Sequence, residues 1–158
     1  MEHFPSTHDA RQSRELMERA QEQIDRQGYG FWAVEIQASG AFAGFVGISD
    51  VSDSRLSFAP AVEVGWRLAR EFWGKSIAFE AAAASIGLGF ERLDLGEIVA
   101  YTAAGNERSR ALMERLGMRR DPAEDFLHPA LAEGHRVAPH VIYRLTRPDW
   151  EQQRPGPR

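Results

Sequence analysis

Cysteine is absent from the 158-residue chain, which excludes a disulfide framework, a thiolate metal site and a cysteine nucleophile. No apolar run approaches the roughly 20 residues that a membrane-spanning helix needs. The polar opening segment MEHFPSTHDARQ does not match a secretory signal peptide. From these absences we expect a cytoplasmic protein without a membrane partner.

Lysine is nearly absent, because Lys75 is the single lysine among 19 basic residues, and the net charge is −4. No basic stripe with interleaved aromatic residues occurs, so we expect no nucleic-acid partner. A mildly acidic surface suits a basic or amine substrate. With 43% hydrophobic and 27% charged residues the composition is that of a globular protein, and the length fits one domain. We expect that domain at residues 1–147 and a loose, proline-rich tail at 148–158.

Hydrophobic periodicity and turn residues predict a mixed α/β domain. An amphipathic helix is expected at residues 9–27, with Ser6 and Asp9 as a capping box. An alanine-rich helix at 77–93 is apolar on nearly all sides and is expected to be buried. A third helix begins after Asn106 as its N-cap. Strands are predicted at 31–36, 42–51, 62–68, 97–103, 118–126 and 140–147, the first two joined as a hairpin.

The segment from residue 62 to 78 carries the clearest chemical signal. A strand leads through the turn AREFWGKS into a helix N-terminus, whose first N–H groups have no partner within the helix. These groups and the helix dipole favour an anion, and Lys75 adds a positive charge. Ordinary solvated turns have the same pattern, so the residues alone leave both interpretations open.

The same turn comes close to the phosphate loop of NTPases, GxxxxGK[ST], but Ala69 stands where that loop has its first glycine. Phe72 and Trp73 are bulky for such a loop, and the strand at 97–103 lacks a terminal aspartate for Mg²⁺. A nucleotide-binding protein is therefore the less favoured alternative.

Four stretches together resemble the GNAT acetyltransferase superfamily, and more closely its branch that acetylates the N-termini of ribosomal proteins. They are GFWAVE (30–35), AVEVGWRLAREFWGKSIAFEA (61–81), YTAAGNERSRALMERLGM (101–118), and DF-x-HP with EGH and HVIYRL (125–145). The resemblance covers nearly the whole chain. It implies an α/β fold with a mostly antiparallel mixed sheet, whose central strand pair splays apart between flanking helices. It also implies acetyl-CoA as co-substrate, without a metal, and an amine acceptor, either a protein N-terminus or a small molecule.

The resemblance also assigns site residues. It implies that the backbone of Arg67, Leu68 and Ala69 lies along the pantetheine arm of acetyl-CoA. It implies that Asn106 and Ser109 flank the sulfur. The pyrophosphate loop of the family corresponds to Trp73, Gly74, Lys75, Ser76, Ile77 and Ala78.

The chain departs from the family in three places. Ser76 stands where the family usually has glycine, so a left-handed backbone there would be strained. Met113 stands where many members have a tyrosine general acid, which leaves Ser109 or a water to protonate the departing thiolate. The opening MEHFP aligns with an internal stretch of the relatives, so we expect either an upstream start or the loss of the first strand and helix.

Glu63 is the expected general base, acting directly or through water. It lies in an otherwise apolar strand beside the implied cleft, where burial raises the pKa of a carboxyl group. A solvent-facing or arginine-paired Glu63 is the alternative interpretation. Glu35 and Glu80 are the next candidates, although Glu80 fits better as a partner of the helix dipole.

His128, His135 and His140 are spaced by seven and five residues, which does not place them on one helix face, so we expect no metal site. We interpret them as structural residues or as a border of the acceptor site. Trp32 and Trp66 are interpreted as core or cleft wall.

The sequence thus predicts an N-acetyltransferase in which the amine attacks the thioester directly in a ternary complex, while a backbone N–H stabilises the oxyanion. A non-catalytic acyl-CoA-binding module is the alternative. The strands at 31–36 and 42–51 contain no lysine or proline, so we also expect a homodimer through an open sheet edge.

Overall fold

The computed structural model describes residues 9–132 and 134–153, and within them seven strands form one sheet. The strands are β1 (Phe31–Ile36), β2 (Ala41–Val51), β3 (Ala61–Leu68), β4 (Glu97–Ala103), β5 (Arg119–Arg120), β6 (Phe126–Leu127) and β7 (Pro139–Thr146). Their order is β1-β2-β3-β4-β7-β5, and β6 also pairs with β7. The described pairs are antiparallel except for β3 with β4, which are parallel.

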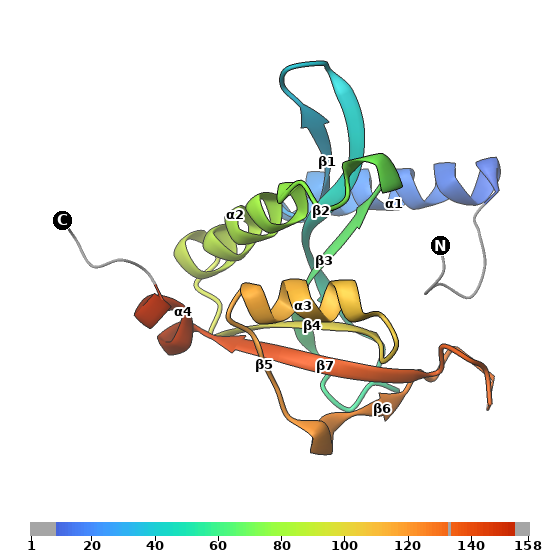
Figure 1. Cartoon of the computed structure of the whole chain (residues 1–158), viewed down its shortest axis with the longest axis vertical. Helices are drawn as coiled ribbons and strands as arrows, with labels where there is room; N and C mark the ends of the chain where they lie inside the picture. Colours follow the sequence, from blue (N-terminus) through green and yellow to red (C-terminus); the bar gives the residue numbers. More distant parts are fainter. Residues whose placement is uncertain (1–8, 133, 154–158) are drawn as a thin grey trace.

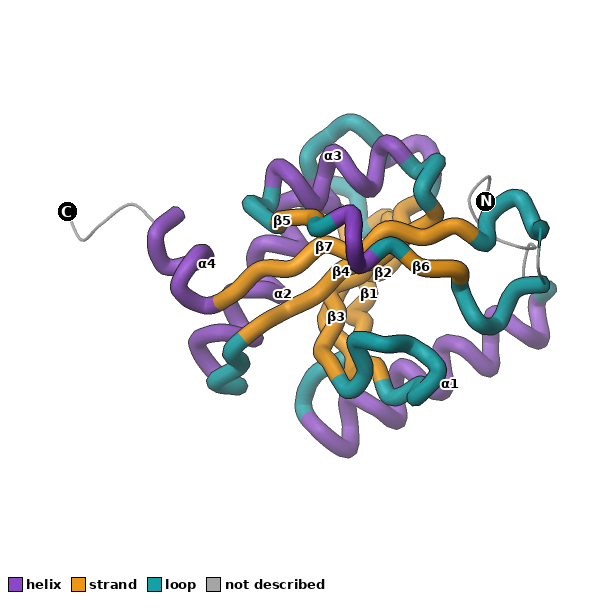
Figure 2. The backbone as a smooth tube through the Cα atoms, turned by 90° about the horizontal axis from the view of Figure 1, so that it is seen from below, coloured by secondary structure: helices purple, strands orange, loops and turns teal. Residues whose placement is uncertain are grey.

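Four α-helices accompany this sheet in the described part of the chain. They are α1 (Ala10–Gln27), α2 (Ile77–Arg92), α3 (Glu107–Arg115) and α4 (Arg147–Gln153). Figure 1 shows the β1–β2 hairpin projecting beyond the helices, and Figure 2 shows α1 and α3 on opposite sides of the strands. The sheet therefore has two differently covered faces.

Helix α1 begins at a capping box, as predicted, but Asp9 is the N-cap residue. The Asp9 carboxylate accepts the Gln12 N–H at 2.7 Å, and the Gln12 side chain accepts the Asp9 N–H at 2.9 Å. Ser6, the other expected member of the box, lies outside the described residues. At the far end of α1 the side chain of Gln23 accepts a hydrogen bond from Ser49 on β2 at 3.1 Å. This contact assigns α1 to the face on which Ser49 lies.

The hydrophobic core lies on the opposite face, under α2 and α3. Its fully buried members include Ile48, Val64, Phe90 and Met113. Close packing of α2 depends on Gly89, because a Cβ there would lie 2.8 Å from the Ile98 Cδ1. The predicted burial of the alanine-rich helix is thus correct for its sheet-facing side.

Two predicted segments differ from the structure. The strand expected at 118–126 is broken into β5 and β6 by a 3₁₀ turn at Pro122–Glu124, because Pro122 lacks the N–H that a strand ladder needs. The tail expected to be loose from residue 148 forms α4 up to Gln153, and Trp150 packs its ring 5.0 Å from Phe90. Aromatic burial on α2 therefore orders a segment whose proline-rich composition predicted a loop.

Candidate active site

The gap between β3 and β4 is the central feature of the site. The two strands share the single register pair Glu63–Val99, and β3 then continues to Leu68 alongside β2 rather than β4. The Ala69 N–H donates to the Ala43 carbonyl on β2 at 2.9 Å. Because successive amides of an extended strand point to opposite sides, the Leu68 N–H faces the gap and the Ala69 N–H does not.

The loop that follows β3 bends into α2 through two left-handed residues, Gly74 (φ 71°) and Ser76 (φ 60°). The predicted strain at Ser76 is thus confirmed, since a residue with a Cβ atom rarely adopts this conformation. The first helical hydrogen bond of α2 runs from the Glu80 N–H to the Ser76 carbonyl. The N–H groups of the three residues between them, 77–79, have no partner within the helix.

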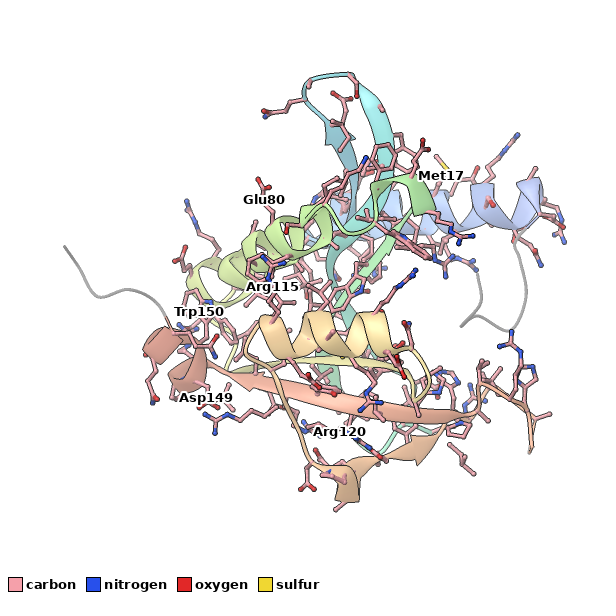
Figure 3. All side chains as sticks on the ribbon, in the orientation of Figure 1. Met17, Glu80, Arg115, Arg120, Asp149 and Trp150 are labelled. Carbon is pink, nitrogen blue, oxygen red and sulfur yellow. The ribbon has the colours of Figure 1, made fainter. Side chains whose placement is uncertain are left out.

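Basic side chains from α3 reach this loop. The Arg115 Nη1 donates to the Ser76 Oγ at 3.2 Å, and its guanidinium lies 4.0 Å from the Phe79 ring centroid. Figure 3 shows Arg115 between α2 and α3. The Arg108 guanidinium lies 4.7 Å from the Trp73 ring centroid. These two arginines were not identified from the sequence, although their spacing of seven residues places them on one helix face.

Trp73 closes the outer end of the gap. Its indole N–H donates to the Leu68 carbonyl at 2.8 Å, and the residue is 39% exposed. A Cβ added to Gly74 would meet no atom within 4 Å, so the loop borders open space. Lys75 is exposed, with its Nζ 5.7 Å from the Phe72 ring centroid.

These residues fit the diphosphate and pantetheine of an acyl-CoA. Open N–H groups at a helix N-terminus bind phosphate oxygens, and the basic side chains nearby complement their charge. The edge of β3 that faces the gap offers the backbone groups that an amide-containing arm can pair with.

Ser109 lies at the start of α3, on the core face of the sheet. Its Oγ accepts hydrogen bonds from the Trp66 indole N–H at 3.3 Å and from the Asn106 side-chain amide at 3.0 Å. The same amide donates to the Thr102 Oγ1 at 2.9 Å. Because a hydroxyl has two acceptor positions and one hydrogen, these contacts leave the hydrogen of Ser109 to donate elsewhere.

Glu63 lies on the other face. Its cross-strand partner is Ser49, which contacts α1, and directly opposed residues in an antiparallel pair share a face. Burial raises the pKa of Glu63 to about 7, and a hydrogen bond from Tyr101 partly opposes that rise. The expected rise in pKa is thus confirmed. Burial and the neighbouring Glu63 together raise the pKa of Tyr101, which keeps its hydroxyl protonated.

The histidines are divided between two places. His128 and His140 lie together, with ring centroids 4.8 Å apart, while the His135 Nδ1 accepts the Val137 N–H at 3.3 Å. Within residues 9–132 and 134–153, no three His, Asp or Glu side chains come together as a metal site requires.

The other candidate residues are placed away from both sets of groups or serve packing. Glu35 and Glu80 are exposed, and Figure 3 shows Glu80 pointing away from the sheet. Met113 is 2% exposed within the core, so it offers no proton donor to the gap. Trp32 and Trp66 pack against the core, and the half-buried Arg67 has its guanidinium 5.5 Å from the Phe45 ring centroid.

Comparison with known proteins gives concordant matches. Residues 1–119 match the acetyltransferase (GNAT) domain. The chain is 31% identical over 139 residues to an Aspergillus fumigatus FsC-acetyl coenzyme A-N(2)-transacetylase, covering 82% of this chain and 55% of that protein. It is 30% identical over 106 residues to the ribosomal protein uS5-alanine N-acetyltransferase of Escherichia coli, covering 66% and 53%. The chain thus spans about half the length of these two relatives.

The fold agrees with that of solved acetyltransferases. The structure of the ribosomal-protein-S5-alanine acetyltransferase from Vibrio fischeri superposes with a TM-score of 0.72 at 20% identity, covering 94% of this chain and 80% of that one. The predicted fold class is confirmed, and the phosphate-loop NTPase alternative is wrong, since β3 and β4 form the single parallel pair in the described sheet. None of the described helices has the length and apolar character to cross a membrane. The chain belongs to the acetyltransferase (GNAT) domain family.

Proposed function

We propose that this chain is an N-acetyltransferase that moves an acetyl group from acetyl-CoA to a primary amine by direct attack in a ternary complex. One observation carries the proposal. Glu63 and Ser109 flank the gap between β3 and β4 from opposite faces, and each has the protonation state that its role needs. A base on one side and a proton donor on the other fit attack and departure along one line.

The proposed reaction begins with an ammonium group that loses a proton to the carboxylate of Glu63, directly or through water. A pKa of about 7 lets Glu63 accept this proton near neutral pH, and the Tyr101 hydroxyl orients the carboxylate. The neutral nitrogen attacks the thioester carbon, and a β3 N–H that faces the gap meets the oxyanion. The C–S bond then breaks, Ser109 donates its hydrogen to the departing thiolate, and a second proton leaves the nitrogen.

Acetyl-CoA is proposed to enter with its pantetheine along the gap at Leu68 and its diphosphate on the loop at Trp73–Ala78. Trp73 has to release the Leu68 carbonyl if that group is to pair with the pantetheine. Asn106 would act by holding Ser109, since its amide donates to the hydroxyl and its side-chain oxygen accepts the Ser109 N–H at 3.3 Å.

The test is release of thiol from acetyl-CoA in the presence of a panel of amines. The chain has no cysteine of its own, so a thiol reagent reports only the product. We expect amine-dependent release that Glu63→Gln lowers about 10²-fold, while Glu35→Gln, an exposed carboxylate on β1, leaves it unchanged. CoA binding without release by any amine would favour the non-catalytic module instead.

A further inference from the structure

Five rings gather on the face of the sheet where Glu63 lies. We call Phe58, Tyr101, Phe126, His128 and His140 the ring cluster. Their neighbouring centroids are 4.8 to 6.4 Å apart, and each residue is partly exposed. They come from four places in the chain: the loop before β3, β4, the β6 region and β7. The fold therefore assembles a wall of rings that still reaches solvent.

The ring cluster continues outward from the proposed base. Tyr101 donates its hydroxyl to Glu63, and its ring lies 5.2 Å from Phe58 and 6.4 Å from both His128 and His140, measured between centroids. A group that reaches Glu63 from this face thus passes beside the rings. No other function of the described site uses them.

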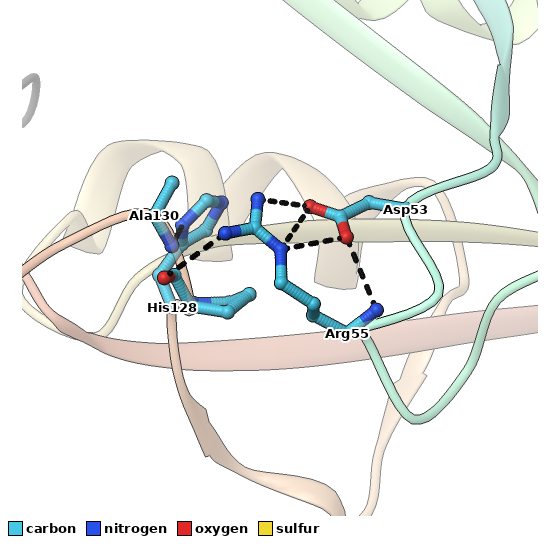
Figure 4. A network of polar contacts seen from close by, with 5 residues as sticks. Asp53, Arg55, His128 and Ala130 are labelled. Atoms are coloured by element: carbon cyan, nitrogen blue, oxygen red, sulfur yellow. Dashed lines mark hydrogen bonds and ion pairs between the residues drawn. The ribbon is translucent and has the colours of Figure 1, made fainter.

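An ion pair closes the outer rim. Arg55 binds Asp53 at 2.7 Å and donates to the Pro129 carbonyl at 3.5 Å, which links the loop of Phe58 to the loop of His128 (Figure 4). Glu63, Asp53 and Arg55 are the charged side chains that act on the titratable rings. Of these three, two are occupied with each other.

The imidazoles are neutral walls above neutral pH. The His140 Nδ1 donates to the Ala138 carbonyl at 3.1 Å, and the His128 Nδ1 accepts the Ala130 N–H at 3.3 Å. Burial lowers the pKa of both residues. Their faces then pack against planar or apolar groups as the phenylalanine rings do.

We propose that the ring cluster binds the body of the acceptor, and that the acceptor is a primary amine carried on a planar, apolar group. This inference rests on the proposed acetyltransferase function and names its substrate class. The amine reaches Glu63, and the planar body stacks between Phe58, Phe126 and the imidazoles.

Two other acceptor classes fit less well. A polyamine carries further ammonium groups that need further carboxylates, and Asp53 is already bound by Arg55 through three side-chain contacts. A free amino acid carries a carboxylate that needs a cation, and Arg55 is held by Asp53 and Pro129. Either class would have to break the rim ion pair.

The experiment compares 2-phenylethylamine, spermidine and alanine as acceptors for the full chain, by thiol release from acetyl-CoA and by calorimetric binding of each amine to the CoA complex. We expect kcat/KM for 2-phenylethylamine to exceed that for the other two by at least about tenfold. Phe126→Ala should raise its KM about tenfold without changing the KM of acetyl-CoA, and Phe126→Leu should have a smaller effect. Phe42→Ala, a 64% exposed ring on β2, is the control and should change neither constant.

The outcomes separate the two claims. A preference for spermidine or alanine, or Phe126→Ala kinetics equal to those of the parent chain, overturns the ring-cluster inference and leaves acetyl transfer standing. Binding of 2-phenylethylamine that depends on Phe126, without thiol release, supports the site and contradicts the proposed catalysis. Absence of amine binding overturns the inference. A CoA-induced thermal shift in each variant establishes that it is folded.

Discussion

Replacing Glu63 by glutamine should stabilise the protein at high pH and not at low pH. The folded-state pKa of Glu63 is raised from 4.5 to about 7, so the folded state holds a proton that the unfolded state has lost. Stability therefore falls as pH rises from 4.5, and the whole loss is present above pH 7. A shift of this size corresponds to about 3 kcal/mol at most, because the side chain is partly exposed. Glutamine keeps the shape of the neutral acid and an oxygen for the Tyr101 hydroxyl, and it does not titrate.

The assay is urea unfolding of Glu63→Gln and of the parent chain at pH 5 and pH 8. At pH 8 we expect the variant to gain about 2–3 kcal/mol in the free energy of unfolding, or about 5–10 °C in Tm, relative to the parent. At pH 5 most of that gain should be gone. Glu35→Gln on the exposed side of β1 serves as the control, with an equal effect at both values. The same difference for Glu63→Gln at pH 5 and pH 8 would refute the argument that Glu63 is buried and titrates near 7.

Three further substitutions test the loop and the proton donor. Ser76→Gly removes a left-handed strain of about 1 kcal/mol and adds unfolded-state entropy of similar size, so stability should change little and CoA should bind equally or more tightly. A tenfold loss of CoA affinity would instead identify the Ser76 hydroxyl as a ligand. Lys75→Ala should weaken CoA binding by only a few-fold by titration, because the diphosphate pairs mainly with backbone N–H groups; a hundredfold loss would contradict this. Ser109→Ala should lower kcat about 10²-fold at nearly constant KM for acetyl-CoA, whereas an unchanged kcat would assign the proton donation to water.

The sequence predicted the framework well because its signals are local. Each long strand and the first three helices lie within one or two residues of the predicted bounds, since alternation, caps and the glycine after α1 act over a few neighbours. The errors came from competing local signals. Pro122 interrupted a segment whose pattern favoured a strand, and Trp150 found a partner on α2 that a proline-rich composition does not reveal.

The site could be predicted only where one segment or the family pattern carried it. Glu63, Ser109 and the loop at Trp73–Ala78 follow from a strand, a helix cap and a turn in the sequence. The ring cluster does not, because its members come from segments between residues 58 and 140 that only the sheet order brings together. Arg115 likewise approaches Ser76 through the packing of α3 beside α2.

Thermal unfolding with CoA and with ATP–Mg²⁺ tests the central claim, that the gap between β3 and β4 and the loop after β3 bind an acyl-CoA. At a hundredfold excess over its Kd, CoA should add about 2.7 kcal/mol to the free energy of unfolding and raise Tm by about 5–10 °C. ATP–Mg²⁺ at the same concentration should leave Tm unchanged. A shift with ATP–Mg²⁺ and none with CoA would contradict the account.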